Sequence, residues 1–145
     1  MTASPRPGAP DLGPASVIIL PQFVDERGAL TVAESGSSLP FQPQRFFVLS
    51  DVPSDAERGA HANRETHELL VCVSGQFSVS VDQGDGTSSI DLSDPTVAVH
   101  VPPLVWVRIH HATPGAVMVV AASHRYDPAD AVRDRSEFLR LLGRR

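Results

Sequence analysis

Short apolar or alternating segments follow one another along the chain from Val17 onward. A repeat of two residues, rather than of 3.6, is typical of β-strands, whose side chains point alternately to opposite faces. The pattern therefore predicts strands at 17–20, 30–33, 46–49, 69–73, 77–81, 90–92, 97–101, 105–109 and 117–122.

Turn sequences rich in Gly, Pro, Asp and Ser separate these segments, for example at 83–86 and 113–115. Many short strands with such spacing indicate an all-β barrel or sandwich built from sequential hairpins. Segment 69–73 is apolar at every position, which is typical of a strand that is covered on both faces. We therefore expect it to be a central strand.

Only the end of the chain has a helical pattern. Asp127 can cap a helix and Pro128 suits the first helical position. One apolar stripe follows, formed by Val132, Phe138, Leu139 and Leu142. We predict a single C-terminal helix that packs on the barrel.

Residues 1–16 are rich in Pro, Gly, Ala and Ser, a composition that buries little apolar surface. We therefore expect a disordered N-terminal tail, and one domain at 17–145, because a chain of 145 residues forms about one core. The net charge is −5 and basic residues do not cluster with aromatic ones, which argues against nucleic acid as a partner. Neither a membrane span nor the apolar core of a signal peptide is visible, so we expect a cytoplasmic protein without a membrane partner.

The stretch 58–68, Arg-Gly-Ala-His-Ala-Asn-Arg-Glu-Thr-His-Glu, holds the most informative polar residues. If 58–63 is extended, His61 and Asn63 project from the same face. Facing the mouth of a barrel, they would form a polar patch on an apolar wall, as small-molecule sites do. Imidazole also suits proton transfer near neutral pH, which makes His61 the first candidate for catalysis.

This stretch resembles the first motif of the cupin superfamily, in which a Gly precedes His-x-His, a Glu follows four residues later and a Gly closes the motif. The corresponding residues here are Gly59, His61, Asn63, Glu68 and Gly75, with Asn63 in place of the second histidine. A closer resemblance, to the nucleotide-sugar 3,4-ketoisomerases (WxcM-like), covers nearly all of 17–145. It rests on 25–30, 40–45, 58–62, 101–106, 122–127 and 130–138.

The resemblance implies an RmlC-like jelly-roll barrel that forms a homodimer and needs neither metal nor cofactor. Such enzymes move a keto group between C4 and C3 of a dTDP-linked 4-keto-6-deoxyhexose, in deoxysugar biosynthesis, through an ene-diol(ate). On this reading His61 is the base and Asn63 orients the substrate or stabilises an oxyanion. The predicted substrate-binding residues are Arg45, Arg58, Arg64, Trp106 and Tyr126. The three arginines suit a pyrophosphate, because a guanidinium binds phosphate oxygens in a bidentate way.

Two other functions fit the same residues. A metal-dependent cupin enzyme would use His61, Glu68 and His110 as ligands. A sugar-nucleotide-binding module without activity would explain Asn63, and also Phe47, which lies near the position where the family tends to have tyrosine. Two of the predicted binding residues have alternative roles, since Trp106 also suits the core and Tyr126 also suits packing under the helix. No constellation is recognisable around the other histidines, His67, His100, His111 and His124.

Overall fold

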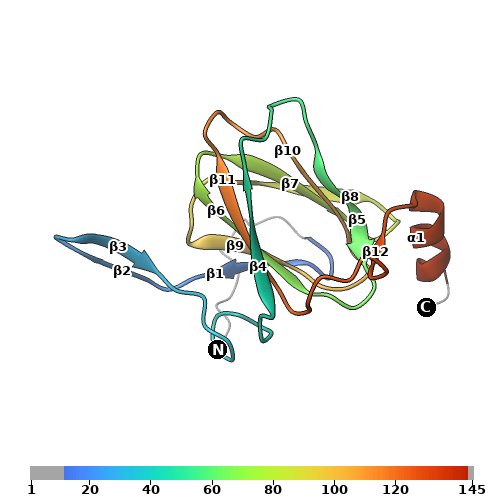
Figure 1. Ribbon diagram of the computed structural model, residues 1–145, viewed down its shortest axis with the longest axis horizontal. Coiled ribbons are helices and arrows are strands. Elements are labelled where there is room, and N and C mark those ends of the chain that lie inside the picture. Colours follow the sequence, from blue (N-terminus) through green and yellow to red (C-terminus); the bar gives the residue numbers. More distant parts are fainter. Residues whose placement is uncertain (1–11, 144–145) are drawn as a thin grey trace.

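The computed structural model describes residues 12–143, which fold mainly into strands. Two five-stranded antiparallel sheets form a jelly roll, with one short helix at the C-terminal end (Figure 1). In sheet order, the first sheet contains β1 (Ser16–Ile19), β9 (Val97–Val101), β6 (Glu68–Ser74), β11 (Val117–Ala122) and β4 (Arg45–Ser50). The second contains β12 (Ala131–Val132), β5 (Arg58–Asn63), β10 (Trp106–His110), β7 (Phe77–Asp82) and β8 (Thr87–Leu92).

The chain passes repeatedly from one sheet to the other. From β4 to β7, and again from β8 to β11, each strand lies in the sheet opposite to the strand before it. Strands that are distant in sequence therefore become neighbours, as β4 and β11 do. The expected succession of hairpins is wrong, since only β2–β3 and β7–β8 pair as sequential strands among the described residues. This arrangement confirms the expected all-β jelly roll, and β6 is the central strand of its sheet, as its apolar sequence predicted.

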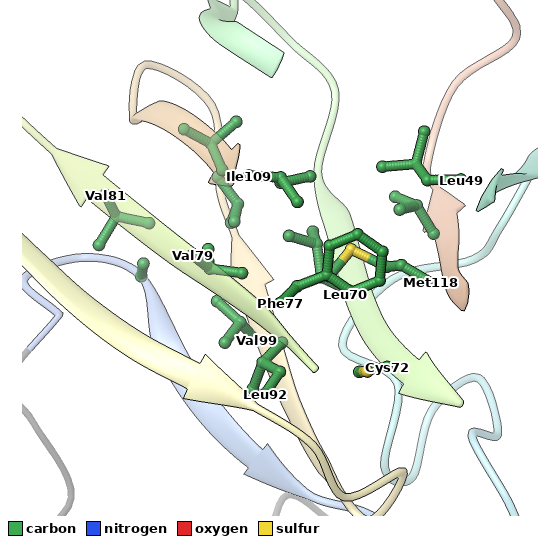
Figure 2. Close-up of a cluster of buried hydrophobic side chains, with 14 of the residues drawn as sticks. Leu49, Leu70, Cys72, Phe77, Val79, Val81, Leu92, Val99, Ile109 and Met118 are labelled. Atoms are coloured by element: carbon green, nitrogen blue, oxygen red, sulfur yellow. The ribbon is translucent and has the colours of Figure 1, made fainter. Parts of the chain in front are cut away.

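A hydrophobic core fills the space between the sheets (Figure 2). The second sheet contributes Phe77 and Val79, and the first contributes Leu70 and Met118, all of which are fully buried. Cys72 lies in the same core, where its thiol packs as a small apolar group. The core occupies only part of the space between the sheets, and the candidate site lies in the rest.

Two elements extend beyond the two sheets. The hairpin of β2 (Gln22–Asp25) and β3 (Gly28–Thr31) projects away from the body at one end. Helix α1 (Arg135–Leu142) lies at the other end, next to β12 (Figure 1). No helix within 12–143 combines the length and the apolar character needed to cross a membrane.

Each of the predicted strand segments corresponds to a strand of the structure, whereas the start of the helix was predicted wrongly. The helix begins at Arg135 and its N-cap is Asp134, not Asp127. Asp127 instead accepts a hydrogen bond from the backbone of Ala129 in a turn, and the chain then pairs with β5 through β12. Pairing with a sheet edge has overridden the local helix signal.

The N-terminal tail was expected to include residues 1–16. Residues 1–11 lie outside the described residues. The remainder packs against the body, because Leu12 and Ala15 are buried in the main core and β1 begins at Ser16. The ordered domain therefore includes residues before Val17.

Candidate active site

A cavity of about 550 Å³ opens between the two sheets. Its volume lies within the range of roughly 300–1,000 Å³ that is usual for small-molecule sites. The first sheet contributes Leu49, Glu68, Leu70 and Val120, and the second contributes Gly59, His61, Asn63, Val107 and Ile109. Polar and apolar groups thus share the walls, as the sequence predicted.

A β-bulge in β5 sets the direction of the His61 side chain. Residues 107 and 108 of β10 pair with His61 and Gly59, so the register skips Ala60. Gly59 and Ala60 have φ angles of 80° and 55°, in the left-handed region that favours glycine. A bulge of this kind bends a strand locally and re-aims the next side chains, here into the cavity.

His61 is partly exposed, but its Nδ1 atom is buried and has no hydrogen-bond partner among residues 12–143. Burial lowers the pKa of His61, and the backbone of Gly59 partly offsets this effect. The positive charge of Arg133 lowers the pKa further. The imidazole is therefore neutral near pH 7, and because the residue lines the cavity, its ring can exchange a proton with a bound molecule.

Asn63 lines the same wall, two residues along β5, which confirms the predicted alternation. Its backbone is held on both sides, because its carbonyl accepts a hydrogen bond from Leu104 and the residue pairs with Ala131 of β12. The side-chain amide can donate hydrogen bonds but cannot transfer a proton at neutral pH. Asn63 is thus suited to orienting a ligand.

Three arginines, Arg45, Arg58 and Arg133, also line the cavity. Arg45 donates a hydrogen bond to the carbonyl of His124, and its guanidinium carbon lies 5.6 Å from the centre of the Tyr126 ring. Tyr126 also lines the cavity, yet 72% of its surface is exposed. A flat aromatic ring and several guanidinium groups therefore surround the opening.

The structure does not bring Arg64 and Trp106 to this cavity. Arg64 forms an ion pair of 2.5 Å with Glu137 of the helix. Trp106 lies on the other face of the second sheet, 5.3 Å from the ring of Phe138, and belongs to the small core beneath the helix. Both residues hold α1 in place, and alternation puts Val107, rather than Trp106, on the cavity side.

Acidic groups complete the site, and the sequence analysis had assigned none of them to substrate binding or proton transfer, although it considered Glu68 as a metal ligand. Asp130 accepts hydrogen bonds from the Thr66 hydroxyl at 2.5 Å and from the backbone of Glu65 at 2.7 Å. Glu68 is only 5% exposed, and burial raises its pKa to about 7. Asp130 and Arg133 were missed because their segment was assigned to a helix. The apolar stripe has a long gap between residues 132 and 138, and this gap was the signal in the sequence that the helix begins later.

The residues considered for a metal do not converge. His61 and Glu68 line the cavity, but His110 lies on the outer face of β10, with its Nε2 atom 2.7 Å from the Ser80 hydroxyl. Within 12–143, no three His, Cys, Asp or Glu side chains are arranged as ligands of one ion. The donor set therefore does not fit a resident metal.

Two histidines outside the cavity are paired, contrary to expectation. Nδ1 of His67 lies 3.0 Å from Nε2 of His100, and the two rings stack with their centres 5.2 Å apart. Phe41 packs beside both rings. Burial, together with His67, lowers the pKa of His100 to about 4. Because residues 67 and 100 are distant in sequence, only strand pairing reveals this contact.

Comparison with protein families gives a match over residues 14–143 to the family described as FdtA, WxcM-like, C-terminal. The chain belongs to this family. Among characterised proteins, this WxcM-like chain is 32% identical over 128 residues to the TDP-4-oxo-6-deoxy-α-D-glucose-3,4-oxoisomerase of Aneurinibacillus thermoaerophilus. The match covers 88% of this chain and 92% of that enzyme.

Solved structures agree with this assignment. The sugar 3,4-ketoisomerase QdtA of Thermoanaerobacterium thermosaccharolyticum, in complex with TDP, superimposes with a TM-score of 0.87 at 29% identity, over 90% of this chain and 95% of that chain. A mutant of the same enzyme in complex with TDP-4-keto-6-deoxyglucose gives the same TM-score, identity and coverage. The resemblance inferred from the motifs is thereby confirmed.

Proposed function

We propose that this WxcM-like protein is a sugar 3,4-ketoisomerase that acts on a TDP-linked 4-keto-6-deoxyhexose in deoxysugar biosynthesis. The observation that carries the proposal is the His61 imidazole, neutral near pH 7, on the wall of a cavity of about 550 Å³. Similarity over nearly the whole chain to an enzyme with this activity supports the choice of reaction. We also expect the protein to act in the cytoplasm, without a cofactor.

The reaction exchanges protons between two adjacent carbons and consumes no other reagent. The His61 imidazole removes the proton from C3, the C3–H electrons form a C3=C4 double bond, and O4 takes up negative charge or a proton. The proton then returns to C4, while O3 loses its proton and becomes the new carbonyl. A neutral imidazole suits both carbon steps, since it accepts a proton and returns it as imidazolium.

Asn63 and the arginines that line the cavity have supporting roles in this proposal. The Asn63 amide donates to the oxygen that becomes negative, which stabilises the transition state by a few kcal/mol, about the 3–4 measured for comparable donors. Arg45 and Arg58 bind the pyrophosphate and Tyr126 covers the nucleotide end, because all three surround the opening. Arg133 joins this group on the same evidence.

Turnover of TDP-4-keto-6-deoxyglucose, followed by NMR, tests the proposal. We expect the wild type to form a 3-keto product, and His61→Asn to bind the substrate but turn it over about 10²–10⁴-fold more slowly, the usual contribution of a general base. His110→Asn is the matched control, because His110 lies outside the cavity, and it should leave turnover unchanged. Binding without turnover by the wild type would instead identify a binding module. Activity that depends on stoichiometric iron or zinc would identify a metal-dependent cupin.

We also propose that the protein forms a homodimer through the β2–β3 hairpin. Phe23, Val24 and Leu30 of the hairpin are 66%, 71% and 59% exposed. A two-stranded hairpin alone is at best marginally stable in water, so a second copy that covers these side chains would stabilise it. The outer face of β4, where Phe46 is 73% and Val48 is 50% exposed, offers an apolar surface for this contact.

A further inference from the structure

A keto shift between neighbouring carbons moves two protons, one between C3 and C4 and one between the two oxygens. In the proposed function, His61 accounts for the carbon proton. The oxygen proton must leave O3 and reach O4, so a group that both donates and accepts near the oxygens would speed the reaction. Asn63 and Phe47, which line the cavity, cannot titrate at neutral pH.

Glu68 faces the same cavity from the opposite sheet. It is the first residue of β6, and alternation along this strand directs both Glu68 and Leu70 inward, where they line the cavity. His61 lies in β5, which belongs to the other sheet. A sugar ring held between the sheets would therefore have the imidazole on one side and the Glu68 carboxyl on the other.

The surroundings of Glu68 keep its carboxyl close to neutrality. Burial raises its pKa to about 7, Arg45 of β4 opposes this effect, and Asp130 adds to it. The other charged or titratable groups that line the cavity are His61, Tyr126, Glu57, Arg58, Asp127 and Arg133. Near pH 7 the Glu68 carboxyl is thus present in both its donor and its acceptor form.

The other acids of the cavity are engaged elsewhere. Both carboxylate oxygens of Asp130 accept hydrogen bonds, from Thr66 and from the backbone of Glu65. Glu57 pairs with Arg108 at 3.2 Å, and Asp127 accepts from the backbone of Ala129. Glu68 is the buried acid on the cavity wall within the described range 12–143.

We propose that Glu68 is a second catalytic residue of the proposed isomerase and carries the proton between O3 and O4 of the hexose. Its acid form donates to O4 as the carbonyl becomes an enol, and the resulting carboxylate accepts the proton of O3 as the new carbonyl forms. Each transfer breaks one O–H bond and forms another, so Glu68 returns to its starting state. The inference rests on the proposed function and extends it to a residue on the facing sheet.

The test compares Glu68→Gln, which keeps the shape but cannot transfer a proton, with Glu65→Gln, a change at an exposed neighbour. For Glu68→Gln we expect kcat to fall about 10²–10⁴-fold with a nearly unchanged KM, and the limb of the wild-type kcat profile near pH 7 to disappear. Exchange of the C3 hydrogen with solvent deuterium should fall less than turnover does, because the amide of Glu68→Gln can still donate a hydrogen bond to O4 while His61 removes the C3 proton. Glu65→Gln should match the wild type in all three measurements.

Separate outcomes distinguish the two proposals. If the wild type turns over and Glu68→Gln keeps its kcat within about twofold with the same pH profile, the role of Glu68 is wrong and the isomerase stands. If the wild type neither turns over nor exchanges the C3 hydrogen, the proposed function fails and this inference fails with it. Loss of both turnover and C3 exchange in a folded Glu68→Gln would also overturn the inference, since Glu68 would then not act on oxygen alone.

A stability measurement shows whether Glu68→Gln still folds and whether Glu68 titrates as described. A carboxyl whose pKa is raised in the folded state stabilises the fold fully below its unfolded value of about 4.5, and this contribution is lost as the pH rises through about 7. The lowered pKa values of His61 and His100 act in the opposite direction, but equally in both proteins. Relative to Glu68→Gln, the wild type should therefore become less stable in urea as the pH rises from 5 to 8. An equal change in both proteins would contradict the assigned titration and, with it, the inference.

Discussion

At the scale of single residues, the position of the His61 ring depends on the two preceding residues, neither of which has a reactive side chain. Gly59 and Ala60 adopt left-handed φ angles of 80° and 55°, and together they form the bulge that turns β5 toward the cavity. Such a conformation costs a residue with a side chain about 1–3 kcal/mol. The structure therefore maintains a strained backbone beside its candidate base, which is common at functional sites.

Replacement of Gly59 tests this dependence. A Cβ atom at residue 59 would lie 2.9 Å from the carbonyl oxygen of Val107, closer than such contacts occur. We expect Gly59→Ala to lower the free energy of unfolding by roughly 1–3 kcal/mol in urea and to reduce turnover by displacing His61. Ala60→Gly is the control, because glycine relieves the strain at that position, and it should be neutral or stabilising. Equal stability of Gly59→Ala and the wild type would contradict this account.

At the scale of elements, alternation along the chain located the strands because the strands of the two large sheets have one face in the core. The same reasoning placed the start of the helix too early. Asp127 and Pro128 have the composition of a helix start. In the structure, however, residues 131–132 pair with β5 as strand β12, and a helix at these positions would lose that pairing. Local propensity is a weak preference, and a sheet edge with free hydrogen-bonding groups outweighs it.

The cap of α1 provides a prediction at this scale. The Asp134 side chain accepts a hydrogen bond from the backbone of Ser136 at 2.8 Å. We expect Asp134→Ala to lower the free energy of unfolding by about 1 kcal/mol, and Asp134→Asn, which also caps well, to change it by much less. Urea denaturation with circular dichroism measures both. If Asp127→Ala reduced the helical signal as much as Asp134→Ala, the assigned helix start would be wrong.

At the scale of the whole molecule, the β2–β3 hairpin stands out because it projects from the body and exposes apolar side chains (Figure 1). If it forms the proposed dimer contact, replacing Phe23 and Leu30, which are paired across the hairpin, by serine should produce monomers. Analytical ultracentrifugation at equal concentrations measures this change. Leu139→Ser is the control, since Leu139 is 43% exposed on α1 at the opposite end of the molecule, and it should remain dimeric. A monomeric wild type would contradict the proposal.

The sequence alone determined which segments are strands and which side chains share a face, because both follow from local alternation. It therefore predicted that His61 and Asn63 project together, and its motifs indicated the family. Which strands become neighbours was decided only by the tertiary structure, because pairing joins segments that are distant in sequence. Glu68 faces His61, Arg64 and Trp106 hold the helix, and His67 stacks on His100 for this reason. Burial, which sets the pKa values of His61 and Glu68, likewise arises only when the two sheets close on each other.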